Sequence, residues 1–401
     1  MSPPDGLFPS RSSPSARLTS VISHFSSPPY KVVVCRNLGP DVMPLLENRH
    51  EFELVVWPED RACDRTWLLE NIAGATGVIV MLTDKVDTEL LDKAGPSLRV
   101  VSTMSVGHEH IDLKAAAQRA LKVGYTPDVL TDAGKSALHP CSSTLMNFCA
   151  VADLSVMLAL MAGRNGGIGA ALVQNGEWSN FSWAPFGFCG PQLSTTATSP
   201  TRKIGFLGFG RIAQATLARL VPFGITHCLY SSGPSSPPNL QRDAELEKKY
   251  NLKAVAKVDL DELARESDVL FVLAPGGSGT YHVVNEGLLK KMKKTSIIVN
   301  ASRGTLVDSD ALAKALKEGW IWGAGLDVVE GEPNVTRDHP LVKEPRCVIV
   351  PHIASATLET RKSMATRAAH NLIAAIFGEN MPAEVDLSAF YRMVNDGPHR
   401  P

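Results

Sequence analysis

Three polar groups follow late strands of the chain, in the order arginine, carboxylate, histidine. Arg303 stands in the segment NASRG, His352 follows the apolar run at 348–350, and an acid-containing segment, 325–333, lies between them. An arginine can bind a carboxylate through two parallel hydrogen bonds, which a lysine cannot do. A histidine at a strand end can donate a proton near neutral pH, and a neighbouring carboxylate would orient its ring and raise its pKa. The pattern predicts proton transfer to a substrate that carries a carboxylate.

Each of these residues also has an ordinary structural explanation. Arg303 could form a surface ion pair, and His352 could be a turn residue whose hydrogen bonds are satisfied. Asp327 and Glu330 could cap or solvate a loop. The interpretation as a site rests on the order of the three groups behind a nucleotide-binding loop, because parallel α/β sheets bind ligands at the carboxyl ends of their strands.

That loop reads Gly208-Phe-Gly210-Arg-Ile-Ala213, between an apolar strand pattern and a helical one. In this context the first glycine permits a tight turn, the second lets the backbone approach a pyrophosphate, and the alanine keeps the helix close to the strand. Arg211 and Ile212 open the helix, whose free N–H groups and positive dipole end favour phosphates. These five residues are predicted to bind a dinucleotide; a glycine-rich turn without a ligand is the alternative.

The choice between NAD and NADP depends on the residue about 20 positions further on, where an NAD enzyme carries Asp or Glu for the ribose 2′-hydroxyl. Here the sequence reads Tyr230-Ser231-Ser232-Gly233, without an acid, and the nearest base downstream is Arg242. Small hydroxyl side chains can bind a 2′-phosphate, so Ser231 and Ser232 are predicted to contact the cofactor. We expect NADP or NAD, with a preference for NADPH.

Two series of short β-branched runs alternate with amphipathic stretches, which is typical of βαβ units and parallel sheets. The expected strands are 31–36, 77–82, 98–103 and 122–126 in the first series, and 203–207, 227–230, 269–273, 296–300, 323–328 and 348–350 in the second. A helix over 152–163 is expected to cross between the two units, and a long helix over about 356–377 to return to the first.

The predicted fold class is therefore α/β, with two doubly wound, Rossmann-like parallel-sheet domains. The cofactor domain, 166–355, is expected to be inserted in a discontinuous substrate domain, 30–165 plus 356–388. The cleft between the domains is the expected ligand site.

Composition argues against several other classes. The 401 residues include 40 basic and 41 acidic ones, so no nucleic-acid partner is expected. No apolar run reaches the ~18–20 residues of a membrane helix, so no membrane partner is expected. The seven cysteines are odd in number and form no C-x-x-C pair, which argues against a disulfide framework and favours a reducing compartment. No metal site is assigned.

Residues 1–29 are rich in Ser and Pro and contain a single acid, Asp5. A transit peptide can have this composition. A disordered tail and a start codon placed too early are the alternatives. We expect a cytoplasmic protein, or a mitochondrial one if residues 1–29 act as a transit peptide.

From about Lys31 to Leu387 the chain resembles the D-isomer-specific 2-hydroxyacid dehydrogenases, and within them the glyoxylate reductase/hydroxypyruvate reductase branch. The family resemblance is carried by GFLGFGRIA, NASRGTLVD, GAGLDVVEGEP and VPHIASAT, and the branch by VVSTMSVG, VGYTPDVLTDA and PHIASAT. The resemblance implies an oxidoreductase that reduces glyoxylate or hydroxypyruvate to glycolate or D-glycerate by hydride transfer from NAD(P)H.

The resemblance also implies roles for single residues. Asp327 would hold the nicotinamide carboxamide, and the backbone N–H groups of Val106 and Gly107 would bind the substrate carboxylate together with Arg303. A homodimer is implied, in which Trp183 of the partner subunit closes the pocket. The catalytic residues implied are Arg303, Glu332 and His352.

Two features depart from the family pattern. Where relatives read Gly, a variable residue, Asp and His, this chain reads Gly107-His108-Glu109-His110. The second strand end also lacks the arginine expected in the NADPH-using branch. The resemblance therefore leaves the substrate loop near Glu109 undefined.

A segment without periodicity, 134–150, interrupts the resemblance just before the interdomain helix; it reads GKSALHPCSSTLMNFCA. Its first codons can contain an intron donor sequence, GGTAAGTCN, and the Ala150–Val151 junction can contain an acceptor. Its removal would restore the run TDAVADLSVM. We expect a translated intron; a genuine surface insertion is the alternative.

Two other functions stay open at this point. The chain could act on another keto acid within the same family. It could also be a non-enzymatic, NAD-sensing corepressor built on the same fold. Consumption of NADPH in the presence of glyoxylate would distinguish an enzyme from a corepressor.

Overall fold

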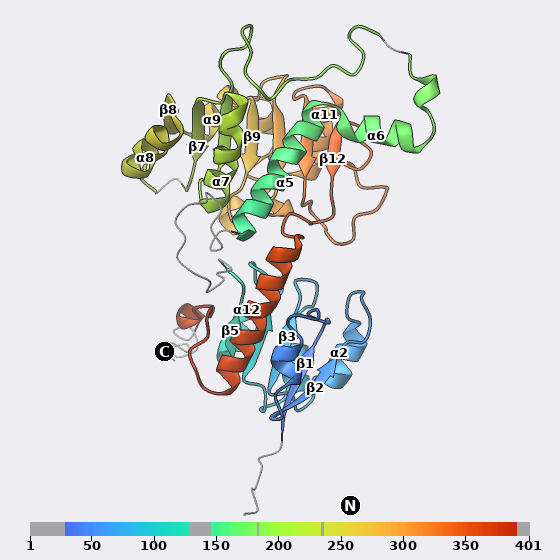
Figure 1. Cartoon of the computed structure of the whole chain (residues 1–401), viewed down its shortest axis with the longest axis vertical. Helices are drawn as coiled ribbons and strands as arrows, with labels where there is room; N and C mark the ends of the chain where they lie inside the picture. The colour runs from blue at the N-terminus through green and yellow to red at the C-terminus, as the bar shows by residue number, and fades with distance from the viewer. Residues whose placement is uncertain (1–28, 128–145, 183, 234–235, 391–401) are drawn as a thin grey trace, which may run out of the picture.

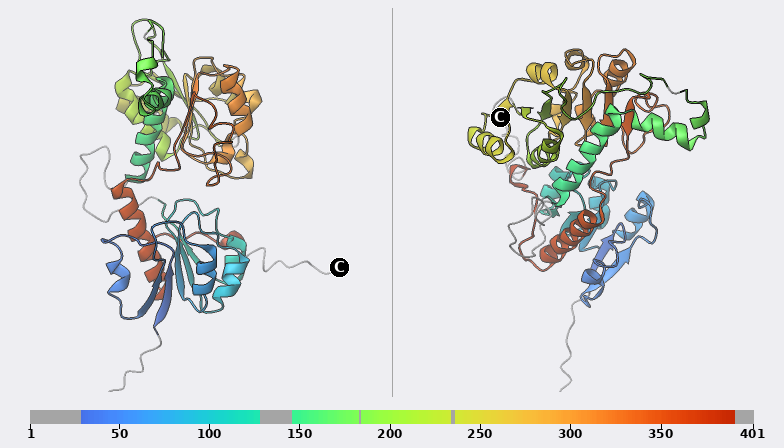
Figure 2. Two further views of the ribbon diagram at one scale, coloured as in Figure 1. Left: turned by 90° about the vertical axis from the view of Figure 1, so that its right-hand side faces the viewer. Right: turned by 45° about the horizontal axis from the view of Figure 1, so that its top comes forward.

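The protein consists of two α/β domains placed end to end (Figure 1). The computed structural model describes residues 29–127, 146–182, 184–233 and 236–390. Each domain contains its own parallel sheet with helices on both faces, as Figure 2 shows from two further sides. The predicted fold class is confirmed.

The first domain contains five parallel strands in the order β2-β1-β3-β4-β5. The strands are β1 (Tyr30–Val34), β2 (Phe52–Val56), β3 (Gly77–Val80), β4 (Val100–Thr103) and β5 (Lys122–Gly124). The helices that follow them are α1 (Pro44–Glu47), α2 (Arg65–Asn71), α3 (Thr88–Ala94) and α4 (Leu113–Gln118). Successive side chains of a strand point to opposite faces, so Val33 packs with α2, α3 and α4 while Val32 and Val34 pack on the other face.

A long C-terminal helix, α12 (Leu358–Ile376), covers that other face (Figure 1). The Ser102 hydroxyl donates to the carbonyl oxygen of Ala368 at 2.8 Å, and the Asn371 amide donates to the carbonyl oxygen of Tyr125 at 2.9 Å. Helix α12 therefore completes the first domain.

The second domain contains seven parallel strands in the order β12-β11-β10-β9-β6-β7-β8. The strands are β6 (Lys203–Leu207), β7 (His227–Ser231), β8 (Ala254–Lys257), β9 (Val269–Val272), β10 (Ile297–Asn300), β11 (Gly323–Leu326) and β12 (Cys347–Ile349). The helices are α5 (Met146–Gly163), α6 (Gly166–Gln174), α7 (Arg211–Leu220), α8 (Leu240–Tyr250), α9 (Leu260–Glu266), α10 (Glu286–Leu289) and α11 (Ser309–Lys317). The strand order reverses between β6 and β9, which is where open α/β sheets bind ligands.

Helix α5 is part of the core of the second domain. Leu158 and Ala159 are buried, and a Cβ atom on Gly325 of β11 would lie 2.8 Å from the Cβ atom of Leu158. Within the described residues no single helix is long and apolar enough to cross a membrane; α5 and α6 pass that test only together, across a bend of 76°.

Several elements differ from the sequence-based expectation. Strands β2 and β8 were not predicted, and each lies at one of the two edges of its sheet with a partly exposed surface. The interdomain helix begins at Met146, earlier than the expected residue 152. Cys35, Cys63, Cys189, Cys228 and Cys347 are free thiols, whereas Cys149 is disulfide-bonded.

Candidate active site

The glycine loop between β6 and α7 has the geometry that a pyrophosphate needs. Gly208 has φ +86°, and a Cβ atom there would lie 2.6 Å from the Cα atom of Ala274, which follows β9. Gly210 caps α7 without any side-chain hydrogen bond, and open space surrounds the position of its missing Cβ atom. Ala213 is fully buried between helix and strand. The first turn of α7 therefore presents its N–H groups to a ligand, and the site fits a dinucleotide.

The side chain of Arg242, which the sequence shows as the nearest base downstream of β7, lies against the glycine loop and Tyr230. The guanidinium carbon of Arg242 lies 4.6 Å from the ring centre of Phe209 and 4.8 Å from that of Tyr230. Its Nη1 donates to the carbonyl oxygen of Phe209 at 3.3 Å, and its Nη2 pairs with Asp243 at 2.6 Å. Helix α8 thus places Arg242 against the glycine loop. The sequence shows Arg242, but no local pattern indicates that α8 would bring its side chain to the glycine loop.

Helix α7, which follows the glycine loop, contacts a residue of the suspected intron segment. The guanidinium carbon of Arg211 lies 4.4 Å from the ring centre of Phe148, and Phe148 is buried. Ile212 packs beside Val151, the residue that follows the segment. Residues 146–150 form the start of α5, whereas 134–145 lie outside the described residues. The intron hypothesis stays a prediction.

Arg303 is positioned by the loop that follows β10. The Asn300 side chain donates to the carbonyl oxygen of Arg303 at 2.9 Å and accepts the Ser302 N–H at 3.1 Å, which fixes the turn. The Nη1 atom of Arg303 donates to the carbonyl oxygen of Ser302 at 2.8 Å.

The side chain of Arg303 reaches across to the loop after β4 of the first domain. A Cβ atom on Gly107 would collide with Nη2 of Arg303, so the guanidinium lies directly against the Gly107 backbone. Val106 is 44% exposed. Among the described residues, neither the Val106 N–H nor the Gly107 N–H donates a backbone hydrogen bond. The guanidinium of Arg303 therefore lies against the Gly107 backbone, and together they can bind a carboxylate.

Glu109 already interacts with this guanidinium. Its Oε1 lies 3.1 Å from Nε of Arg303. Partial burial alone would raise the pKa of Glu109, but the positive charge and hydrogen bond of Arg303 hold this pKa below its ordinary value. The sequence showed Glu109 only as a departure from the family pattern, and nothing in it pointed to a partner 194 residues away.

His352 follows β12 in a left-handed backbone conformation, with φ +54°. Its backbone N–H donates to the carbonyl oxygen of Asp327 at 2.9 Å. The carboxylate of Asp327 accepts the N–H groups of Ile353 at 2.7 Å and Ala354 at 3.1 Å. Asp327 is 1% exposed, and this burial raises its pKa. Asp327 therefore anchors the histidine loop; its predicted contact with a carboxamide stays a prediction.

The structure shows which carboxylate of the segment 325–333 contacts the imidazole of His352. The Oε1 atom of Glu332 lies 3.1 Å from Nδ1 of His352. Glu330 instead binds His282 at 2.9 Å and the Tyr281 hydroxyl at 3.1 Å. Glu332 is thus the carboxylate that contacts the imidazole of His352.

The neighbouring strands β10, β11 and β12 end at the same edge of the sheet and bring Arg303, Asp327 and His352 together there. Trp183, the predicted residue from the partner subunit, lies outside the described residues.

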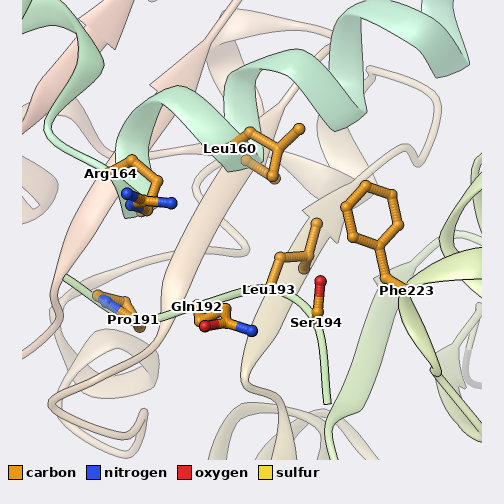
Figure 3. A pocket seen from close by; sticks show the side chains of 9 residues that line it. Leu160, Arg164, Pro191, Gln192, Leu193, Ser194 and Phe223 are labelled. Carbon is orange, nitrogen blue, oxygen red and sulfur yellow. The ribbon is translucent and has the colours of Figure 1, made fainter. Parts of the chain in front are cut away.

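A cavity of about 290 Å³ lies elsewhere, beside the C-terminal half of α5 (Figure 3). Its lining includes Leu160, Arg164, Leu193 and Phe223, and none of the predicted site residues. Figure 3 shows apolar side chains around it together with the polar side chains of Arg164, Gln192 and Ser194. It contains none of the acid, base and anion-binding groups described above.

Comparisons with known proteins agree with this geometry. Residues 32–134 match the catalytic domain of the D-isomer specific 2-hydroxyacid dehydrogenases, and residues 156–354 match their NAD binding domain. A glyoxylate reductase from Thermofilum pendens is 39% identical over 82% of this chain and 86% of its own length. The glyoxylate reductase/hydroxypyruvate reductase of Homo sapiens is 37% identical over 89% of this chain and 98% of its own length.

Among solved structures, the NADPH-dependent glyoxylate/hydroxypyruvate reductase of Sinorhizobium meliloti, in complex with NADP and malonate, superposes with a TM-score of 0.67. It is 29% identical, and the match covers 90% of this chain and 98% of that one. The chain belongs to the D-isomer-specific 2-hydroxyacid dehydrogenases, a family of NAD-binding oxidoreductases.

Proposed function

We propose that this protein reduces glyoxylate and hydroxypyruvate to glycolate and D-glycerate. The observation that carries the proposal is the approach of Arg303 to the Gly107 backbone, together with the His352–Glu332 pair at the same edge of the second sheet. This arrangement can bind a carboxylate and deliver a proton to a carbonyl beside it. The reductases described above share most of the chain's length.

Each residue then has a defined part in the reaction. Arg303 and the N–H groups of the Val106–Gly107 loop bind the carboxylate and orient the keto carbon. A bound NAD(P)H supplies the hydride. Glu332, as a carboxylate, can only accept, so Nδ1 of His352 carries a hydrogen and its Nε2 gives the proton to the carbonyl oxygen. Donors aimed at the developing oxyanion stabilise the transition state.

NADPH is the proposed cofactor. The guanidinium of Arg242, paired with Asp243, lies next to the glycine loop and Tyr230 of β7, and Ser231 and Ser232 supply hydroxyls that can contact a 2′-phosphate. The solved relative from Sinorhizobium meliloti contains NADP.

A homodimer is proposed as well. Three large apolar side chains on α6 and the segment after it are exposed: Val173 by 52%, Trp178 by 67% and Phe186 by 90%. Apolar surface of this kind favours association with another chain. Light scattering of the purified protein after size exclusion checks the mass, and a monomer at micromolar concentration would contradict the proposal.

The cytoplasm is the proposed location, with the mitochondrion as the alternative if residues 1–29 act as a transit peptide. A fluorescent protein that carries these residues at its N-terminus tests the choice. Mitochondrial fluorescence would overturn the cytoplasmic assignment.

The function is tested by steady-state oxidation of NADPH and NADH with glyoxylate and with hydroxypyruvate. The expected result is turnover of both acids, faster with NADPH. Turnover of only a bulkier keto acid would favour another dehydrogenase of the family. Absence of turnover despite NADPH binding would favour the corepressor alternative, which none of the relatives named above supports.

A further inference from the structure

We propose that Glu109 is an internal competitor for the substrate carboxylate. In the free enzyme its carboxylate occupies Arg303, and a substrate must displace it in order to bind. The proposal rests on the proposed function in one respect, because it assumes that Arg303 binds a substrate carboxylate.

The first argument is the position of the Glu109 carboxylate. A Cβ atom on Gly107 would collide both with Nη2 of Arg303 and with Oε2 of Glu109. Both groups therefore lie directly against the backbone of Gly107, whose N–H donates no backbone hydrogen bond within the part of the chain that the structure describes. With Oε1 at 3.1 Å from Nε of Arg303, the side chain places one carboxylate where the site would hold another.

The second argument is that a substrate carboxylate can displace Glu109 from Arg303. The side chain of Glu109 is 63% exposed and that of Arg303 is 32% exposed. Among the described residues, Arg303 is the one side chain that Glu109 hydrogen-bonds. Exposed ion pairs are weak, since water solvates both partners and ordering two flexible side chains has an entropic cost. A keto acid that also binds the Val106 and Gly107 N–H groups can therefore replace Glu109.

The third argument concerns the two domains. Glu109 comes from the first domain and Arg303 from the second, so their ion pair joins the two domains. It neutralises the guanidinium while no substrate is present. The competition is expected to weaken substrate binding without slowing the chemical step, because Glu109 has left Arg303 before hydride transfer.

Three variants separate the possible roles of this side chain. Glu109→Gln keeps the shape and removes the charge. Glu109→Asp keeps the charge and shortens the reach by one methylene. Glu70→Gln removes the same charge from an exposed position on α2 of the same domain and serves as the control.

The measurements are kcat and KM for glyoxylate, together with the Kd of oxalate for the NADPH-bound enzyme by calorimetry. Oxalate carries the carboxylate but cannot be reduced. Glu109→Gln is expected to lower both KM and this Kd two- to tenfold, and to leave kcat within twofold of the wild type. Glu109→Asp is also expected to lower the KM for glyoxylate and the Kd of oxalate. Glu70→Gln is expected to change neither value.

Three results would overturn the proposal. An unchanged or higher oxalate Kd in Glu109→Gln would exclude competition. A fall in kcat together with a rise in KM would instead make Glu109 a positioning residue for Arg303. Wild-type affinity in Glu109→Asp, with tighter binding in Glu109→Gln, would point to general charge repulsion. If glyoxylate is not reduced but oxalate binding still tightens, the substrate assignment fails while the competition stands.

Discussion

The Nδ1 atom of His352 lies 3.1 Å from the Oε1 atom of Glu332, and the histidine holds this position with a backbone φ of +54°. A left-handed conformation is rare outside glycine and is stabilised only where the surroundings require it. Here the requirement comes from Asp327, whose backbone carbonyl and carboxylate fix three consecutive N–H groups of the loop.

Replacement of His352 by asparagine should remove the proton donor and preserve the loop, because asparagine tolerates positive φ better than most residues. The expected result is a loss in kcat for reduction of about 10²- to 10⁴-fold. The melting temperature should stay near that of the wild type. A kcat close to wild type would show that another group donates the proton.

Asp327→Asn should weaken the hydrogen bonds that hold the loop at residues 352–354. One of the two carboxylate oxygens becomes an NH₂ group, which cannot accept from Ile353 or Ala354. A buried N–H without its partner costs about 1–3 kcal/mol. Chemical denaturation should show a loss of this size, and kcat should fall because His352 moves. Unchanged stability would mean that the loop is held by other contacts.

His110 should make the stability of the protein depend on acid pH. Burial is the largest cause that lowers its pKa to about 4; Glu109 opposes this shift, and His108 and Arg303 add to it. Between its ordinary pKa near 6.5 and a pH of about 4, the unfolded chain binds the proton more readily, so the fold loses stability as pH falls through this window. The upper limit of the loss is about 3 kcal/mol.

The variant His110→Gln should therefore flatten the fall in melting temperature between pH 6.5 and pH 4. His370→Gln, at an exposed position on α12, serves as the control and should retain the wild-type slope. Equal slopes in all three proteins would contradict a buried, neutral His110.

Arg242→Ala should reduce the preference for NADPH. The variant loses the positive charge beside the end of β7, so the KM for NADPH should rise by at least about tenfold, as expected for a charge-assisted hydrogen bond worth about 1.5–3 kcal/mol. The KM for NADH should change little. Lys248→Ala, on an exposed position of the same helix, is the matched control. An equal rise for both cofactors would indicate damage to α8 or to Asp243 rather than loss of a phosphate contact.

Much of the fold follows from sequence patterns, and the exceptions share a cause. Central strands such as β3, β9 and β10 are buried on both faces and read as continuous apolar runs. Strands β2 and β8 lie at sheet edges, where FELVV and AVAK mix charged with apolar residues and lose that signal. Their place becomes clear only when a neighbouring strand is known.

The residues of the candidate site also divide into those that a local sequence pattern identifies and those that it does not. Gly208, Arg303 and His352 could be found because each follows a recognisable strand at the ligand-binding edge of its sheet. Glu109 and Arg242 could not be assigned, because their partners are set by how two domains meet and by where α8 turns back. Such contacts have no local sequence pattern.

Deletion of residues 134–150 tests the intron hypothesis directly. The deletion removes Phe148 from Arg211 and shortens α5 at its start. If the segment is foreign to the enzyme, the shortened chain should bind NADPH more tightly and turn over faster than the full chain. Phe148→Ala isolates the contribution of the Arg211 contact. Equal activity of full and shortened chains would instead make the segment a tolerated insertion.

The most direct test of the account is kcat/KM for glyoxylate with NADPH in Arg303→Ala, compared with the wild type. Because the guanidinium is proposed to bind the substrate carboxylate and orient the keto carbon, the variant should lose about 10²- to 10³-fold in kcat/KM. Its NADPH affinity, measured by fluorescence, should stay close to wild type. A kcat/KM within a few-fold of wild type would contradict the central claim that Arg303 is the anion-binding residue of the active site.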